Sequence, residues 1–215
     1  MAAHPRARQS ARRNPELVVS KRELWGRRAA MILLPWLVLV VAGFGLALPE
    51  YSQWRYPVAL LGASGIDHAR AFGLLGFVVP GVLAAFAALA VFADDRQSWI
   101  ARVGVQLLFL SGLAFAGLGL FPLDPMDLEG PATQHHSTAW LLWEVAFIPA
   151  MLALGMAVAS RDRDRGLAWL CWGAGAVVLV TGFVPLLPAP LAQRLGFAAW
   201  AAWFGLAAAR WPQRA

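Results

Sequence analysis

Long apolar stretches alternate with short polar segments along most of the chain, and Glu144 is the only charged residue inside them. A helix needs roughly 20 apolar residues to cross the ~30 Å hydrocarbon core of a bilayer. The pattern therefore predicts an all-α polytopic membrane protein, a bundle of six transmembrane helices. These helices are expected over 29–49, 71–92, 103–121, 138–159, 167–187 and 195–209. The transmembrane domain, 29–209, would lie between a basic tail, 1–28, and a short carboxyl-terminal segment, 210–215.

The composition excludes a soluble globular protein, because 60% of the residues are hydrophobic and only 14% are charged. The single cysteine, Cys171, excludes an intramolecular disulfide. A net charge of +6 would suggest nucleic acid as the partner of a soluble chain. Here the basic residues crowd into the first 28 positions and a few short loops, so we expect the lipid bilayer as partner and no nucleic acid.

The basic residues also predict an orientation. Fifteen of the 18 lysine and arginine residues lie on the side that holds both termini, and Arg55, Arg70 and Arg194 lie on the other. By the positive-inside rule, both termini are expected in the cytoplasm, with the protein in the inner (plasma) membrane. The outer loops would be 50–70, 122–137 and 188–194.

A weak repeat suggests that the bundle consists of three helix hairpins. The first, third and fifth helices end alike, with glycine followed shortly by proline, at Gly45–Pro49, Gly119–Pro122 and Gly182–Pro185. Coincidence is the alternative, because glycine and proline are common at helix ends and in membrane spans.

Histidine and aspartate residues gather on the predicted outer side. Asp67 and His68 precede the second helix, and Asp124, His135 and His136 precede the fourth. Helix ends on one side of a small bundle lie within reach of one another. We therefore expect a cluster there that binds a small ligand, a lipid headgroup or an ion. The arginines of the first outer loop could bind lipid phosphate or anchor the loop.

The same cluster could hold a divalent metal as cofactor. His68, Asp124 and either His135 or His136 would be the ligands and would leave an open coordination position for water, as in catalytic zinc sites. This interpretation makes the protein a metal-dependent hydrolase acting on lipid. In the alternative, the histidines cap the fourth helix and hydrogen-bond Asp124 or Asp127 across the loop.

Glu144 is the one acid well inside a span, about six residues past the predicted helix start and roughly 9 Å deep. It should face the bundle interior, as a proton carrier, ligand or general acid–base. The alternative is a packing role, with the carboxyl group hydrogen-bonded to a neighbouring helix through Gln106, Ser111 or Thr181.

Aromatic and small residues carry a further hypothesis. Trp140, Trp143, Trp200 and Trp203 crowd the outer halves of the fourth and sixth helices, where tryptophans usually face lipid, although they could line a tail pocket. Stripes of glycine and alanine let helices approach closely. Such surfaces would suit an accessory subunit of a larger membrane complex, in contact with other subunits or another copy. The residues leave open whether the protein is an enzyme.

Two motifs carry a family resemblance. Gly119-Leu-Phe-Pro-Leu-Asp124 closes one helix shortly before His135-His136, and Tyr56-Pro-Val-Ala-Leu-Leu-Gly62 precedes the second helix. The chain in this respect resembles the domain of unknown function 998 family of multi-span membrane proteins, over about residues 30 to 209. The resemblance implies the architecture and draws attention to Asp124 and His135 or His136, but no activity. This chain has Ala59 where many members carry serine, so no role of that hydroxyl carries over.

Overall fold

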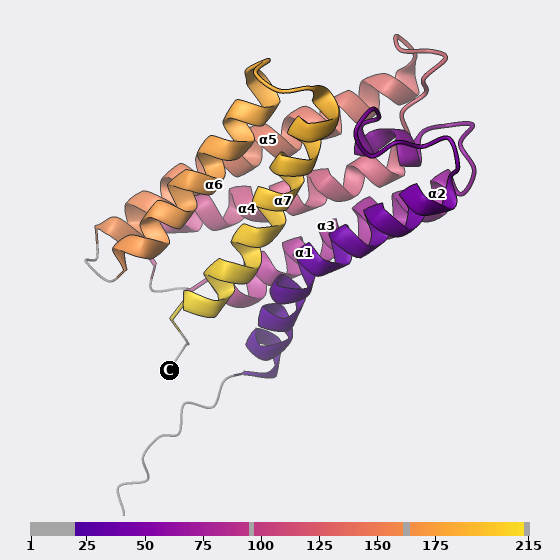
Figure 1. Cartoon of the computed structure of the whole chain (residues 1–215). Helices are drawn as coiled ribbons and strands as arrows, with labels where there is room; N and C mark the ends of the chain where they lie inside the picture. Colours follow the sequence, from indigo (N-terminus) through magenta and orange to yellow (C-terminus); the bar gives the residue numbers. More distant parts are fainter. Residues whose placement is uncertain (1–19, 95–96, 161–163, 213–215) are drawn as a thin grey trace, which may run out of the picture.

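The computed structural model describes residues 20–94, 97–160 and 164–212. These residues form six long helical rods without a strand (Figure 1), which confirms the all-α prediction. One rod is composite, since two π-helical segments, η2 and η3, follow α2 and α3; a short 3₁₀ helix, η1, precedes it. The bounds are α1 Lys21–Ala47, η1 Val58–Gly62, α2 Ala69–Phe72, η2 Gly73–Val78, α3 Val79–Ala87, η3 Ala88–Phe92, α4 Trp99–Leu120, α5 Pro131–Ala159, α6 Arg165–Phe183 and α7 Ala189–Arg210.

Five of the rods are long and apolar enough to cross a membrane: α1, Ala69–Phe92, α4, α5 and α6. The sixth, α7, does not reach the same mean hydropathy, because Gln193 and Arg194 lie in its first turns. All six rods begin earlier than predicted, and α1 starts at Lys21 instead of 29. Helix α5 starts at Pro131 instead of 138, and α7 at Ala189 instead of 195. Proline residues stand in the first turn of both, a position where the missing N–H costs no helical hydrogen bond.

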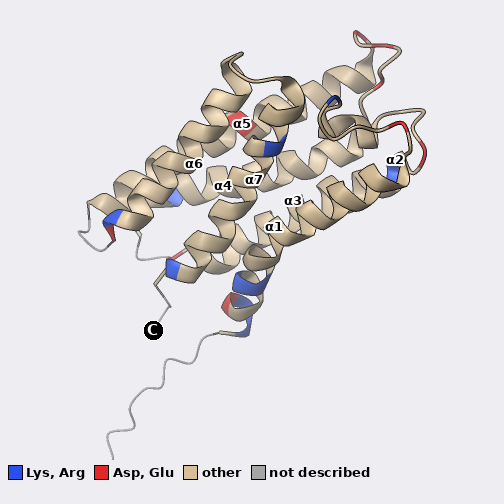
Figure 2. Cartoon of the chain, in the orientation of Figure 1, with Lys and Arg blue, Asp and Glu red and all other residues tan. Residues whose placement is uncertain are grey.

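The rods alternate in direction, so the bundle has two distinct ends (Figure 1). We call the end with the starts of α1 and α4 and the end of α7 the terminal end. The distal end, opposite, holds the loops 48–68, 121–130 and 184–188. Acidic residues of the described chain are prominent in the distal loops, whereas several basic residues mark the terminal end (Figure 2).

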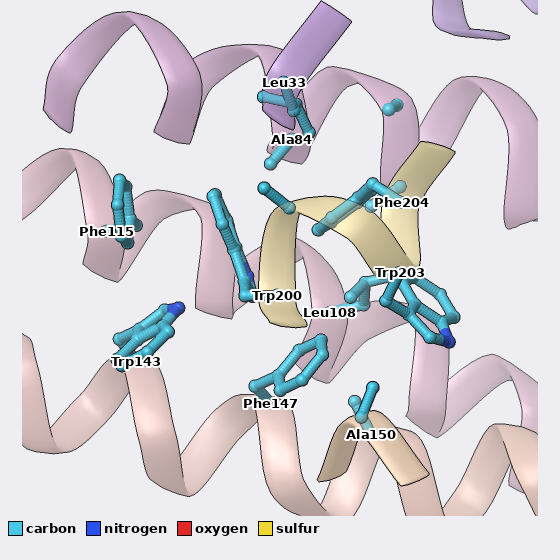
Figure 3. Packing of buried hydrophobic residues seen from close by; sticks show 14 of the residues in the cluster. Leu33, Ala84, Leu108, Phe115, Trp143, Phe147, Ala150, Trp200, Trp203 and Phe204 are labelled. Atoms are coloured by element: carbon cyan, nitrogen blue, oxygen red, sulfur yellow. The ribbon is translucent and has the colours of Figure 1, made fainter. Parts of the chain in front are cut away.

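Aromatic rings fill the centre of the bundle around α7 (Figure 3). Trp200 of α7 stacks on Phe115 of α4, with 4.3 Å between the ring centroids, and its indole N–H donates to the Ser111 hydroxyl at 3.1 Å. Trp143 and Trp203 are also at most 1% exposed. The prediction that these tryptophans face lipid is therefore wrong for all three. Only Trp140 of the predicted group is half-buried at the edge of this core.

Glycine brings the composite rod into backbone contact with α4. A Cβ on Gly81 would lie 2.6 Å from the Gly112 carbonyl oxygen, and a Cβ on Gly112 would lie 2.6 Å from the Ala85 nitrogen. Nearer the distal end, a Cβ on Gly73 would lie 3.0 Å from the Gly119 carbonyl oxygen. Two glycine pairs thus set the spacing of these helices, as small residues do in membrane bundles.

Pro80 explains why η2, the first of the two segments in the composite rod, is π-helical. Pro80 has no N–H to offer to the carbonyls before it, and the Val79 N–H bonds back to Leu74, five residues earlier. The Leu75 carbonyl is therefore left without a helical donor. Trp36 of α1 supplies one, since its indole N–H donates to Leu75 at 2.8 Å. The irregular turn becomes a specific attachment point between α1 and the composite rod.

A buried arginine joins the terminal ends of α1 and α7. Arg27 pairs with Glu23 of the same helix at 2.7 Å and donates to the carbonyl of Ala208. It also donates to the Trp211 carbonyl at 2.9 Å. The positive guanidinium meets the carboxyl end of α7, where unpaired carbonyls carry partial negative charge. Arg27 of α1 thereby caps the carboxyl end of α7.

The glycine contact predicts the effect of one added methyl group. Gly81→Ala should lower the free energy of unfolding by about 1–3 kcal/mol, because the new Cβ would meet α4 backbone, which cannot rotate away. Denaturant titration in detergent micelles measures this. The matched control is Gly43→Ala in α1, where a Cβ meets nothing within 4 Å and stability should hold or rise. Equal stability of the two variants would contradict the assignment of the contact.

Candidate functional site

A short loop at the distal end, 63–68, turns the chain from η1 into α2. Its Ser64 N–H donates to the Leu123 carbonyl at 2.8 Å, so the loop is tied to the loop between α4 and α5. Gly65 and His68 both have left-handed backbone, at φ 82° and 62°. Histidine adopts this conformation at a cost of order 1–3 kcal/mol, which other contacts must offset. The loop thus follows a tight path immediately before α2.

This loop forms one wall of a groove of about 790 Å³. Four polar residues of the groove lie close together in sequence: Ser64, Asp67, His68 and Arg70. Apolar residues of the composite rod and of α4 continue the lining toward the bundle, namely Leu74, Val78 and Leu120. The volume falls within the range of small-molecule sites, about 300–1,000 Å³. The groove therefore has a polar part near the loop 63–68 and an apolar part along the composite rod and α4.

The four polar side chains of the groove are exposed and have no protein partner in the described part of the chain. None of Ser64, Asp67, His68 and Arg70 has a side-chain hydrogen bond or ion pair with another described residue. A structural role would use these donors and acceptors to fix the loop. Here a backbone hydrogen bond fixes the loop, and these side chains are open to solvent.

Two other predicted site residues, Asp124 and His136, have structural roles instead. The Asp124 carboxylate accepts from the Met126 N–H at 3.0 Å, within its own turn. Thr133 accepts from the Asp124 N–H at 3.1 Å and donates to the Asp127 carbonyl at 2.8 Å. His136 donates through Nδ1 to the Phe121 carbonyl at 2.8 Å. These bonds close the loop between α4 and α5.

The residues proposed as metal ligands do not gather around one point. His136 is directed at a backbone carbonyl, and the His135 ring lies 5.3 Å from the Phe121 ring, centroid to centroid. His68 lines the groove, whereas neither Asp124 nor the other two histidines do. Within residues 20–94, 97–160 and 164–212, no three histidine, cysteine or acidic side chains are placed to hold a metal ion.

Glu144 lies inside the bundle and apart from the groove. It is 3% exposed, and a Cβ on Gly182 of α6 would lie 2.6 Å from its carboxyl carbon. Its hydrogen bond comes from Trp140, one turn earlier. Of the partners expected from the sequence, Ser111 accepts from Trp200 and Thr181 donates to Val177. Gly182 therefore makes the room in which α6 covers this carboxyl group.

Sequence reasoning missed a network centred on Arg194. This side chain, in the first turns of α7, donates to the Gln53 side chain at 2.6 Å and to the Tyr51 hydroxyl at 2.9 Å. Gln53 in turn donates to the Val41 carbonyl of α1 at 3.1 Å, where Gly45 leaves the space for its amide. The network attaches the loop after α1 to two helices. Nothing in the local pattern around Arg194 signals partners about 140 residues away.

Tyr51 keeps its proton in this network. Burial raises the pKa of its phenol, and the neighbouring Arg194 opposes that rise through its charge and hydrogen bond. The neutral hydroxyl can therefore accept from Arg194 and donate to the Pro57 carbonyl at 3.2 Å. The loop after α1 is thus held in place by bonds that do not involve Ser64, Asp67, His68 or Arg70.

Comparison with protein families gives one assignment. A family model described as "Protein of unknown function (DUF998)" matches residues 29–210. The chain belongs to the DUF998 family. This match confirms the resemblance seen in the glycine, proline and histidine motifs. No curated protein and no solved structure matched the chain.

The DUF998 match and the apolar helices together identify a membrane protein of unknown function. The DUF998 region runs from the first half of α1 to the end of α7, so it contains the groove, Glu144 and the Arg194 network. Glu23 and Arg27 precede it. The features of the distal end therefore lie within the DUF998 domain itself.

Thr133 offers a test of the structural role assigned to the loop between α4 and α5. Thr133→Val should lower the free energy of unfolding by about 1–3 kcal/mol, because the hydrogen bonds between the buried Thr133 hydroxyl and two backbone groups of the loop are lost. Thr138→Val is the control, since that hydroxyl is exposed and bonds only within its own helix. Thermal unfolding in detergent compares them, and a Thr133→Val protein as stable as the control would refute this role.

Proposed function

We propose that this protein binds a lipid at its distal groove and holds the headgroup with Ser64, Asp67, His68 and Arg70. The observation that carries the proposal is the set of four polar side chains on one groove, none of them bonded to another described residue. This function retains the aspartate and histidine of the predicted site that line the groove. It does not use Asp124 and His136, whose bonds close a loop.

The lining of the groove suits an amphiphile whose head carries a phosphate for Arg70 and a hydrogen-bond donor for Asp67. Arg70 supplies a planar guanidinium, which binds phosphate through two parallel N–H bonds. Ser64 and His68 add hydrogen-bonding groups beside it. Leu74, Val78 and Leu120 follow, and apolar surface of this kind accommodates the first carbons of an acyl chain. A water-soluble metabolite would make no use of these apolar residues, so a lipid fits the groove better.

Arg70 gives the direct test. Arg70→Gln should weaken phospholipid binding about tenfold, because a charged hydrogen-bonding partner of the phosphate is lost. Native mass spectrometry of the purified protein, titrated with phosphatidylglycerol, measures the bound fraction.

The matched control for Arg70→Gln is Arg55→Gln, which removes an exposed arginine from the same distal end but outside the groove lining. Equal lipid binding by the two variants would end the proposal. Parallel thermal unfolding shows whether each variant is folded.

We also propose an orientation, with the terminal end in the cytoplasm and the groove at the outer face of the inner membrane. Fifteen of 18 basic residues support it, because cytoplasmic loops are enriched in lysine and arginine. The groove would then meet the outer leaflet of that membrane, and its lipid would come from there.

Cysteine labelling tests the orientation. In a Cys171→Ala background, Met126→Cys at the distal end should react with a membrane-impermeant maleimide in intact cells. Ser160→Cys, between α5 and α6, should react only after permeabilisation. Both positions are exposed, and Met126 is 94% exposed, so access to reagent depends on the side of the membrane. The reverse labelling pattern would invert the orientation.

A further inference from the structure

A second groove lies on the other side of the loop that forms the first. It has a volume of about 550 Å³ and shares three lining residues with its neighbour, Gly65, Ile66 and Asp67. The rest of its lining comes from the chain after α1, including Leu48, Glu50, Tyr51 and Tyr56. The two grooves are therefore neighbours that share the segment 65–67, here called the ridge, whose charged residue is Asp67.

The two grooves differ in charge. Arg70 and His68 line only the first groove, Glu50 lines only the second, and Asp67 lines both; no lysine or arginine lines the second. Glu50, like Asp67, has no side-chain hydrogen bond or ion pair with a described residue. Arg194 lies near Tyr51, but it is occupied by four hydrogen bonds and does not line the groove. A cation and an anion of one ligand can thus be bound on the two sides of the ridge.

We infer that the two grooves together bind one zwitterionic phospholipid, phosphatidylethanolamine. This inference rests on the proposed function, because it uses the same phosphate position at Arg70. The phosphate of this lipid lies on the Arg70 side, and its primary ammonium reaches across Asp67 toward Glu50. Three N–H groups on the ammonium donate to carboxylates, and such charged hydrogen bonds are about twice as strong as neutral ones.

The charge pattern separates three common headgroups. Phosphatidylglycerol has a phosphate but no cation, so its hydroxyl groups can donate to the carboxylates but bring no positive charge to them. Phosphatidylcholine has a cation without N–H groups, so it cannot donate to Glu50 or Asp67. Among these three, phosphatidylethanolamine alone offers Arg70 a phosphate and the carboxylates a cation that donates hydrogen bonds. Apolar residues in both grooves, such as Leu74 and Leu48, remain for its two acyl chains.

Competition between the three lipids, with identical acyl chains, tests this inference on the full-length protein. Native mass spectrometry should show that the protein binds phosphatidylethanolamine about tenfold more tightly than either of the others. The double variant Glu50→Gln, Asp67→Asn should lose this preference and bind all three alike. Glu129→Gln, an exposed carboxylate of the distal loops outside both linings, should keep it.

The outcomes separate this inference from the proposed function. Equal binding of the three lipids by the unmodified protein, with Arg70→Gln weakening all three, would overturn the ethanolamine selectivity and leave the phosphate site intact. Binding unaffected by Arg70→Gln and by the double variant would overturn both. Glu50 and Asp67 are exposed and unbonded in the protein, so the variants should fold, and the single substitutions provide a second series with the same expected direction.

Discussion

Lipid tails surround an apolar side chain as favourably as another helix does, so helices in a membrane gain little from burying apolar surface against each other. Close backbone approach and hydrogen bonds between helices must hold the bundle together. In this protein, the glycine pairs between the composite rod and α4 provide the first, and the indole N–H bonds of Trp36 and Trp200 provide the second. Helix α7 packs in the centre of the bundle, where its Trp200 ring stacks against Phe115 of α4.

The rigid bundle allows the distal loops to leave their functional groups free. The loop 63–68 is held by its backbone, through Ser64 and Leu123, and the loop after α1 is held by Arg194 and Gln53. Neither attachment uses a charged side chain of the grooves. The groups that hold the loops are therefore different from the charged groups that line the grooves. The proposed lipid site depends on this separation, since a charge already bonded to the protein would offer little to a ligand.

The sequence predicted the helical rods well, because helix existence follows from apolar length alone. It could not predict the burial of Trp143, Trp200 and Trp203, since hydropathy does not tell a ring that faces lipid from one that faces another helix. The histidine and aspartate residues predicted to form one cluster are separated in the structure, and the sequence could not show this for a similar reason. Asp67 and His68 line a groove, whereas His136 bonds a carbonyl fifteen residues earlier in the chain. Such partners depend on how loops fold back, which spacing does not encode.

The capping of α7 by Arg27 also bears on how the chain matures. Ribosomes deliver α1 to the membrane long before α7 exists, so the guanidinium of Arg27 has only Glu23 beside it during most of synthesis. The carbonyls of Ala208 and Trp211 become available at the end of the last rod. The contact between α1 and α7 can therefore form only after α7 has been synthesised, although the two helices stand far apart in the chain.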